Sequence, residues 1–322
     1  MSCKTSNLWT TGATVPERCC AVVRVEDVEQ SEDFLLVRTA PEAGMNINPA
    51  GGEAPAGALI LSRGTRISPV AHSVLCYTGL DSIRVHRRPR IGILTTGDEL
   101  LAPGEPYRKG LTFDSNSWLL RGLLDRLELG CRVYGPAADQ PSLLARQMDE
   151  MTEECDLIVT AGGVSRGCFD YVRATLMGAG YEALIDRTRI KPGRPLIVAA
   201  RDDKLFFGMP GYPAAFLVNC FVYLLPMLRK MMGLANFLNR SDRMRLQGPI
   251  QSRAGRCDFV RVKIHKRVPR FCAEPLPSQL TSHYLNFTSC DGLAVVEPQI
   301  VRLLRGEYVD VIRLEINGDS ES

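Results

Sequence analysis

The feature that most constrains the fold is a regular alternation of short apolar runs with amphipathic stretches across residues 90–235. Runs such as IGIL at 91–94 and LIVT at 157–160 have the length of buried strands, and the stretches between them have a helical period. This alternation is typical of a parallel sheet wound with helices on both faces. The sequence therefore predicts an α/β fold with a central, doubly wound, mostly parallel sheet.

The regions on either side favour β structure. Residues 1–89 read as short strands broken by turns rich in glycine and proline, with one helix-like run at 69–79. Residues 236–322 hold several strand-like runs, as in a small β-barrel. We therefore expect a β-rich N-terminal region at 1–89, an α/β domain at 90–235 and a barrel-like C-terminal β-domain at 236–322.

Charge and cysteine usage exclude several classes of protein. The formal charge is +3 and the basic residues are scattered, so we expect no nucleic-acid partner. The eleven cysteines lack CxxC spacing and no signal peptide precedes them, which predicts a cytoplasmic protein without structural zinc. The apolar segment 213–228 contains Asn219 and Pro226 and is shorter than the roughly 20 residues of a membrane span. We interpret it as a buried helix and expect no membrane partner.

Ligands of a doubly wound sheet bind beyond the carboxyl ends of its strands. Four loops follow predicted strands in this way: TTGDEL at 95–100, TAGGVSRGCFDY at 160–171, IKPGRP at 190–195 and GMPGYPAA at 208–215. These loops hold the candidate functional residues.

The glycine loop allows two interpretations. Gly162 and Gly163 would let backbone N–H groups approach an anion, and Ser165 would add a hydroxyl donor. A turn that only requires a positive φ explains the glycines equally well. By itself the loop does not distinguish phosphate binding from a structural turn.

Acidic residues follow several of the predicted strands. Asp98 and Glu99 stand beside a glycine turn, and Asp139 and Asp170 belong to two other strand-helix units. Helix capping explains the first pair more readily than catalysis. If the carboxylates converge at one sheet edge, they offer the oxygen ligands that Mg²⁺ prefers.

The other two loops are also ambiguous. Lys191 and Arg194 flank a Pro-Gly turn, which suits either a phosphate or an exposed hairpin. Pro210, Gly211 and Pro213 suit either a binding turn or the start of the long apolar helix.

Taken in order, however, the motifs resemble one family. TGDEL, DSNS, AGGVS with a following aspartate, KPGRP and a PGxP turn closely resemble the molybdopterin molybdenumtransferases, the group of MoeA and the gephyrin E-domain. The resemblance continues upstream in TTGATVPERCCAVV and downstream in SRAGRCDFVRV and DGLAVVEP, and covers about 8–314. It implies insertion of molybdate into adenylylated molybdopterin with release of AMP, with Mg²⁺ as cofactor.

The resemblance also implies roles for individual residues. Catalytic roles fall on Glu99, Asp139, Asp170 and Lys191, and Glu99 and Asp170 would bind the metal. The positions implied to bind the pterin substrate are Thr11, Glu53, Thr96, Gly97, Asp98, Gly162, Gly163, Ser165, Arg194, Pro210, Gly211 and Pro213. Family members usually form homodimers with a shared site, so we expect a homodimer, with other cofactor-biosynthesis proteins or molybdoenzymes as further partners.

The chain departs from the family pattern at several places. About the first hundred residues of the pattern, with an MDGYA-like motif, are not in this sequence. Glu53 replaces an aspartate, Arg194 a lysine and Tyr212 an asparagine, and 278–292 differs from the usual run of small residues.

These departures leave two further functions open. A degenerate paralogue would bind the pterin as a carrier, scaffold or sensor without inserting molybdenum. An adenylyltransferase of the related single-domain type would explain the central domain but not the C-terminal one.

Overall fold

The computed structural model describes residues 10–31, 34–137, 140–162, 168–267 and 270–314. The chain divides into two compact units, Met1–Ser62 and Arg63–Ser322. Each unit is therefore described by itself.

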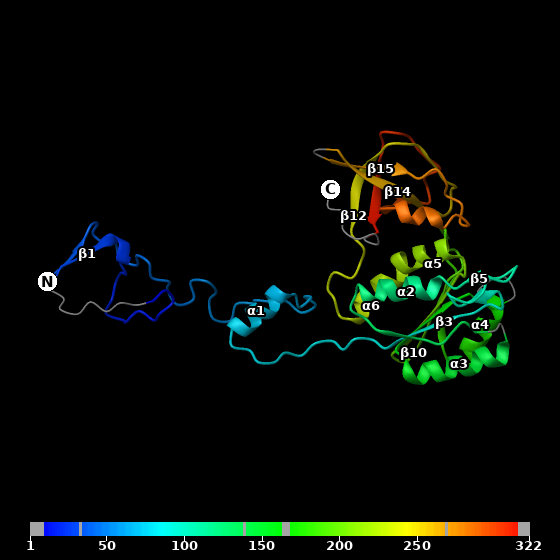
Figure 1. Ribbon diagram of the computed structural model, residues 1–322, viewed down its shortest axis with the longest axis horizontal. Coiled ribbons are helices and arrows are strands. Elements are labelled where there is room, and N and C mark those ends of the chain that lie inside the picture. The colour runs from blue at the N-terminus through cyan, green and yellow to red at the C-terminus, as the bar shows by residue number, and fades with distance from the viewer. Residues whose placement is uncertain (1–9, 32–33, 138–139, 163–167, 268–269, 315–322) are drawn as a thin grey trace. The chain divides into compact units, whose positions relative to one another are not determined.

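A six-stranded sheet forms the centre of the second unit (Figure 1). Its order is β6 (Cys131–Val133), β3 (Ile91–Thr95), β7 (Leu157–Ala161), β11 (Lys204–Met209), β10 (Ile197–Arg201) and β8 (Glu182–Asp186). The first four strands run parallel to one another, and β10 runs antiparallel to both of its neighbours. Strands β3 and β7 are buried along their whole length, which explains their continuous apolar sequence.

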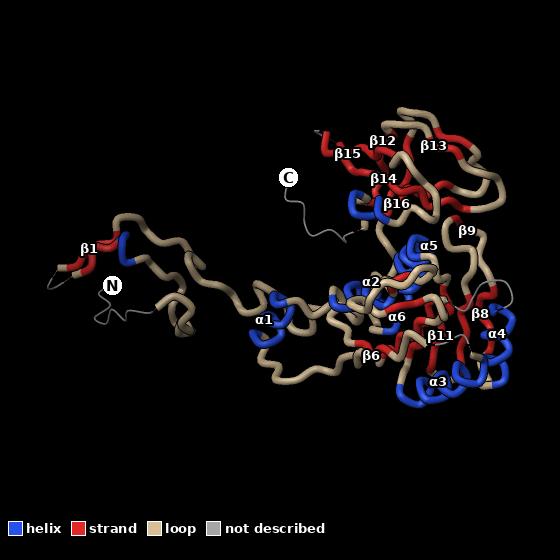
Figure 2. The backbone as a smooth tube through the Cα atoms, turned by 45° about the vertical axis from the view of Figure 1, so that its right-hand side comes forward, coloured by secondary structure: helices blue, strands red, loops and turns tan. Residues whose placement is uncertain are grey.

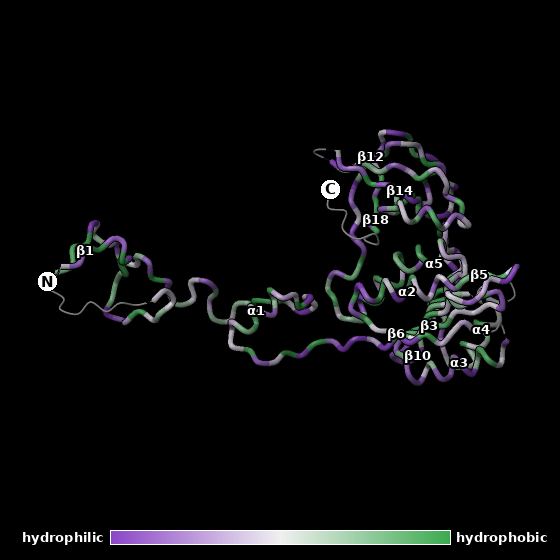
Figure 3. The backbone as a smooth tube through the Cα atoms, in the orientation of Figure 1, coloured by the Kyte–Doolittle hydropathy of each residue, from purple (hydrophilic) through white to green (hydrophobic). Residues whose placement is uncertain are grey.

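Helices cover both faces of this sheet, as the alternation predicted. Helix α2 (Asn116–Asp125), helix α5 (Pro213–Asn219), the π-helical turn Cys220–Leu224 and helix α6 (Leu225–Met231) pack on one face. Helices α3 (Pro141–Glu154) and α4 (Cys168–Gly178) pack on the other. Figure 3 shows hydrophobic segments at β3 of the sheet and at α5 of the helical layer.

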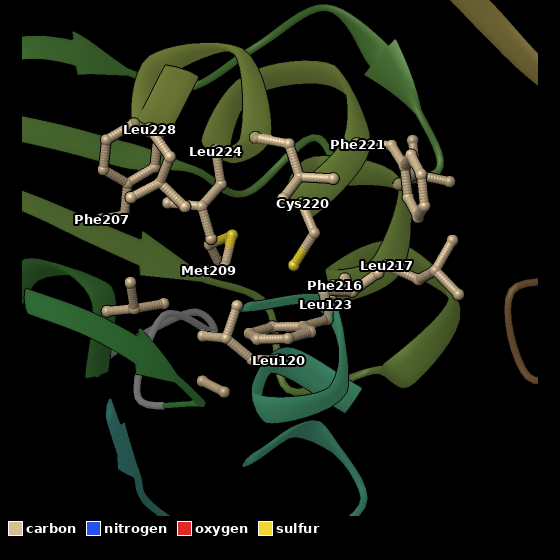
Figure 4. Close-up of a cluster of buried hydrophobic side chains, with 14 of the residues drawn as sticks. Leu120, Leu123, Phe207, Met209, Phe216, Leu217, Cys220, Phe221, Leu224 and Leu228 are labelled. Carbon is tan, nitrogen blue, oxygen red and sulfur yellow. The ribbon is translucent and has the colours of Figure 1, made fainter. Parts of the chain in front are cut away.

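The core between the sheet and the first helical face is closely packed (Figure 4). Phe207 and Met209 of β11 meet Leu120 of α2 and Phe216 of α5 in one apolar cluster. The segment Pro213–Met231 is long and apolar enough to span a membrane by length and composition, but 67% of its window is buried in this core. The predicted buried helix is therefore confirmed.

The C-terminal region forms a closed five-stranded barrel. Strands β14 (Cys257–Arg267), β15 (Arg270–Pro275), β12 (Ser241–Leu246), β18 (Tyr308–Arg313) and β16 (Gly292–Val296) pair in a ring, because β14 contacts both β15 and β16. A short strand β9 (Ile190–Lys191) pairs with β14 in parallel and joins the barrel to the α/β part (Figure 2). Together with the central sheet, the barrel confirms the predicted fold class.

Short elements complete the second unit. They are α1 (Pro69–Tyr77), β4 (Leu100–Leu101), β5 (Thr112–Phe113), β13 (Ile250–Gln251), β17 (Arg302–Leu303) and a 3₁₀ turn at Leu285–Ser289. The first of these, α1, starts with Ser68, whose side chain accepts a hydrogen bond from the N–H of Ala71.

The segment that leads into β3 is anchored by one buried carboxylate. Asp156, which is 4% exposed, accepts hydrogen bonds from the guanidinium groups of Arg87 and Arg90 and from the backbone N–H of Arg90. Hydrogen bonding to Arg87 and Arg90 holds the pKa of Asp156 far below its usual range.

The first unit is built mainly from turns. It contains a 3₁₀ turn at Val25–Asp27 and an antiparallel pair of strands, β1 (Val28–Gln30) and β2 (Leu35–Val37). Among its described residues no side chain is buried, and Phe34, Leu36 and Leu59 are 63%, 52% and 80% exposed.

Candidate functional site

The carboxyl ends of β6, β3, β7 and β11 lie side by side at one edge of the central sheet. Backbone hydrogen bonds continue past the strand ends, from Thr96 N–H to Ala161 O at 3.1 Å and from Gly162 N–H to Met209 O at 3.1 Å. The predicted residues Thr96, Gly97 and Gly162, and the turn at 210–211, therefore lie along the same edge.

Gly162 is required by the close approach of two loops. Its φ is +100°, and a Cβ at this position would lie 2.4 Å from the carbonyl oxygen of Thr96. Its N–H already donates to Met209, so the glycine serves the turn itself. N–H donors of the predicted phosphate cradle would have to come from Gly163 onward, and Gly163 and Ser165 lie outside the described residues.

A buried polar network fixes this edge of the sheet. The carboxylate of Asp114 accepts hydrogen bonds from Thr95 Oγ1 at 2.9 Å, from Ser117 Oγ at 2.6 Å and from the N–H groups of Asn116 and Ser117. All four residues are at most 7% exposed. The network ties the start of α2 to the end of β3, so both elements present their loops in a fixed relation.

Asn116 connects this network to the PGYP turn. Its Nδ2 donates to the carbonyl oxygen of Gly211 at 2.8 Å. Within the described ranges, Asn116 Oδ1 and Thr96 Oγ1 are buried polar atoms without a hydrogen-bond partner. Buried polar groups are normally paired, so these two atoms are exceptions at the edge of the sheet.

The acidic loop after β3 is exposed. Asp98 and Glu99 are both accessible to solvent, and the Glu99 carboxylate folds back so that a Cβ at Gly97 would lie 2.7 Å from Oε2. Asp139 lies outside the described residues. Asp170 falls in the first turn of α4, and its side chain is also outside them. The described side chains contain no group of three or more metal-ligating residues.

The KPGRP loop is held by β14 of the barrel and by Thr188, which lies just before the loop in the chain. Ile190–Lys191 pairs with Cys257–Asp258 of β14, and the hydroxyl of Thr188 donates to the carbonyl oxygens of Gly193 and Arg194, both at 3.2 Å. The side chains of Lys191 and Arg194 are exposed. No ion pair between described residues involves either cation, so both are available to an anionic ligand.

The proline turn at the end of β11 begins the long helix. Pro210 is buried, Gly211 and Tyr212 are exposed, and Pro213 occupies the first turn of α5. The aromatic side chain of Tyr212 is 66% exposed beside Gly211.

Thr11 and Glu53 belong to the first unit, and both are exposed there. The sheet edge belongs to the second unit, so no contact between these residues and the sheet edge is described. Their predicted roles stay predictions.

Cysteines near the KPGRP loop are poor nucleophiles. Burial raises the pKa of Cys257 to about 11, and it also raises the pKa of the fully buried Cys220 thiol. Since the thiolate is the reactive form, neither side chain suits covalent chemistry at neutral pH.

Sequence reasoning missed three residues of this region. The sequence patterns assign no individual role to Asp114, Asn116 or Asn219. The DSNS motif was a signal for the first two, because short polar side chains between a strand and a helix suit both capping and network formation.

Comparison with known proteins adds a family context. Residues 9–79 match the MoeA N-terminal region (domain I and II), residues 92–230 a probable molybdopterin binding domain, and residues 243–314 the MoeA C-terminal region (domain IV). The three matches follow one another along most of the chain.

Individual proteins agree with these matches. Molybdopterin molybdenumtransferase of Nostoc sp. is 31% identical over 228 residues, 70% of this chain and 52% of the relative. The enzyme of the same name from Haemophilus influenzae is 30% identical over 224 residues, 69% of this chain and 55% of the relative. The chain thus spans about half the length of the curated relatives it matches.

A solved structure supports the same fold. The MoeA protein of Pyrococcus horikoshii aligns with a TM-score of 0.79 and 25% identity, over 94% of this chain and 74% of that one.

Proposed function

The chain belongs to the MoeA family, and we propose that it inserts molybdate into adenylylated molybdopterin and releases AMP, as a molybdopterin molybdenumtransferase. Its relatives carry that name, which supports a role in molybdenum cofactor biosynthesis. Molybdate and the pterin would both be substrates.

One observation carries the proposal. Two exposed cations, Lys191 and Arg194, lie on a loop whose backbone is held by hydrogen bonds, and this loop belongs to the same unit as the sheet edge. Lys191 and Arg194 make no ion pair within the described ranges, and hydrogen bonds hold the backbone around them. Ammonium and guanidinium groups form strong, charge-assisted hydrogen bonds with phosphoryl oxygens. The pair would bind the phosphate groups of the substrate and stabilise the charge that develops during release of AMP.

The sheet edge would orient the rest of the substrate. Thr96 Oγ1 can donate or accept a hydrogen bond, and Asn116 Oδ1 can accept one. The predicted acids Glu99, Asp139 and Asp170 would then lie near the molybdate and the phosphoryl group. These roles remain part of the proposal.

Magnesium belongs to the proposal as well. When bound, Mg²⁺ would neutralise phosphoryl charge, and it usually needs only one or two carboxylates together with substrate phosphates. The described side chains do not form a metal site by themselves, so we derive no step through the metal. Glu99 and Asp170 are the residues proposed to hold it.

We also propose a homodimer as the working form. The first unit exposes apolar side chains such as Phe34 and Leu59 and buries none in the described ranges. A second copy of the chain would remove this surface from water.

Cofactor-biosynthesis proteins and molybdoenzymes are further proposed partners. A cytoplasmic location is proposed because no disulfide joins cysteines in the described ranges.

The proposal is tested by incubating the purified chain with adenylylated molybdopterin, molybdate and Mg²⁺. AMP should be released, Asp170→Asn should abolish the release, and a chelator should do the same. If the unmutated protein fails to bind the pterin at all, the proposed function is wrong.

Exposed Tyr212 favours one alternative, a carrier or sensor that binds the pterin without chemistry. A large aromatic side chain beside Gly211 would narrow the approach to the sheet edge while offering a surface for stacking on the pterin. Tight binding of adenylylated molybdopterin that is recovered intact would support this alternative.

A further inference from the structure

A buried amide side chain faces the cationic loop from the core. Asn219, the last residue of α5, is 0% exposed within the apolar cluster. Its Nδ2 donates to the carbonyl oxygen of Pro195 at 3.4 Å. Its Oδ1 lies 2.5 Å from the position that a Cβ on Gly193 would occupy. Gly193 has a φ of +111°, so the amide and the glycine backbone fit closely together.

This arrangement does not favour stability. Asn219 Oδ1 is buried without a hydrogen-bond partner within the described ranges. An unpaired buried acceptor lowers the stability of the fold, and an apolar side chain of the same shape would avoid that loss. A buried asparagine at this position therefore calls for an explanation other than packing.

The helix changes its geometry at the same place. A π-helical turn, Cys220–Leu224, begins directly after Asn219. Such turns are rare and often lie at functional sites. Thr188, just before the loop, donates to the carbonyl oxygens of Gly193 and Arg194. The helix therefore contacts the loop through Asn219, at the residue where its geometry changes.

The loop is also held from the opposite direction by the barrel. Lys191 pairs with Asp258 in the β9–β14 ladder, and Cys257 N–H donates to Arg189 O at 2.8 Å. Gly193 lies between the two cations, and its backbone is the part of the loop that Asn219 contacts. Contacts from the helix and from the barrel thus fix the backbone positions from which Lys191 and Arg194 project.

We propose that Asn219 is a positioning residue, which fixes the spacing of Lys191 and Arg194 so that both cations reach the same anionic group of the substrate. Thr188 assists it through its hydrogen bonds to the carbonyl oxygens of Gly193 and Arg194. This inference rests on the proposed function, since it takes the cations to be substrate ligands. A rigid cation pair loses little conformational freedom on binding, which favours affinity.

The test uses Asn219→Leu in the full chain, with the Kd for adenylylated molybdopterin and the melting temperature as readouts. Leucine has nearly the same shape and removes both the donor and the unpaired acceptor. The melting temperature should stay the same or rise, while the Kd rises about tenfold because the cations lose their fixed spacing.

Gln147→Leu provides a matched control. Gln147 on α3 also donates from its amide to a backbone carbonyl at 3.4 Å, that of Tyr134, and its Oε1 also lacks a partner within the described ranges. This variant should leave the Kd for the pterin unchanged.

A double-mutant cycle separates the inference from the function on which it rests. In a Lys191→Ala, Arg194→Ala background, Asn219→Leu should weaken binding no further, because it acts only through those cations. Equal weakening in both backgrounds, or unchanged binding by the single variant, would overturn the inference. Normal binding by the Lys191→Ala, Arg194→Ala protein would instead overturn the proposed site.

Discussion

At the scale of single residues, a few buried polar side chains fix the geometry around the sheet. Asp114 joins the end of β3 to the start of α2, and Asp156 joins the segment before β3 to the start of β7. Each carboxylate is surrounded by donors, which is the condition for burying a charge without a large loss of stability. Both side chains connect segments that are far apart in the chain.

Asp156 gives a prediction about pH. Its pKa is depressed in the folded protein, so its contribution to stability is complete above the ordinary aspartate pKa of about 4 and is lost as the pH falls further. Asp156→Asn should lower the free energy of unfolding by about 2 kcal/mol at pH 7. It should also flatten the decline of stability below pH 4, measured by urea denaturation at several pH values.

Asp149→Asn is the control, since Asp149 is exposed on α3. It should change the free energy of unfolding by less than about 0.5 kcal/mol. The account would be contradicted if the Asp156→Asn protein had the same free energy of unfolding at pH 7 as the unmutated chain and the same decline of stability below pH 4.

Sequence patterns predicted the positions of several residues along the sheet better than they predicted the hydrogen bonds and contacts that fix those residues. The strand-end rule correctly brought Thr96, Gly97 and Gly162 to one edge of the sheet. The sequence did not indicate that Gly162 N–H donates to Met209 or that Asn219 faces Gly193. Such contacts depend on which segments meet in the folded chain, and local patterns carry no information about that.

At the scale of elements, the barrel contains a loop that depends on one buried cation. Arg261 of β14 is 2% exposed and donates to His283 O at 2.6 Å, to Leu280 O at 2.9 Å and to Asn286 Oδ1 at 2.9 Å. Its guanidinium also lies 5.1 Å from the ring of Phe287. Burial lowers the pKa of Arg261.

Arg261→Lys should loosen this loop. A lysine ammonium lacks the planar fork that reaches several acceptors at once, so the amides of 278–289 should exchange with deuterium at least about tenfold faster. The free energy of unfolding should fall by about 2–4 kcal/mol. Arg305→Lys on the exposed face of the barrel should alter neither quantity, and unchanged exchange in the Arg261→Lys protein would refute the role of Arg261.

Element types followed from the sequence, but strand direction did not. Strands β3 and β7 and helix α1 lie where the sequence patterns predict them. The reversal of β10 was not predicted, because an apolar run reports burial and not direction. The short connection Arg201–Lys204 between β10 and β11 was an available signal, since a parallel pair needs a crossover of a dozen or more residues.

At the scale of the whole molecule, the division of the chain into regions has direct consequences for assembly. The predicted boundaries at 89/90 and 235/236 remain a proposal about folding units, whereas the compact units divide at Ser62. The first unit buries none of its described side chains, and this exposed apolar surface is the basis of the proposed homodimer.

The homodimer is the prediction that belongs to this scale. Light scattering of the purified chain at micromolar concentration should give twice the mass of 35.6 kDa. Phe34→Ser together with Leu36→Ser should shift the protein toward the monomer, because these side chains are 63% and 52% exposed on the first unit. Leu304→Ser on the barrel, which removes a leucine that is 49% exposed, is the control. A monomer in the unmutated protein would contradict the proposal.

We propose that this chain uses the sheet edge and the Lys191–Arg194 pair to insert molybdate. The most direct measurement is the yield of AMP and of molybdenum-loaded pterin when the purified protein is given adenylylated molybdopterin, molybdate and Mg²⁺. The account predicts that both products form in equal amounts, and that neither forms with the Lys191→Ala, Arg194→Ala protein. Recovery of intact adenylylated molybdopterin from the unmutated protein, after binding has been verified, would contradict it.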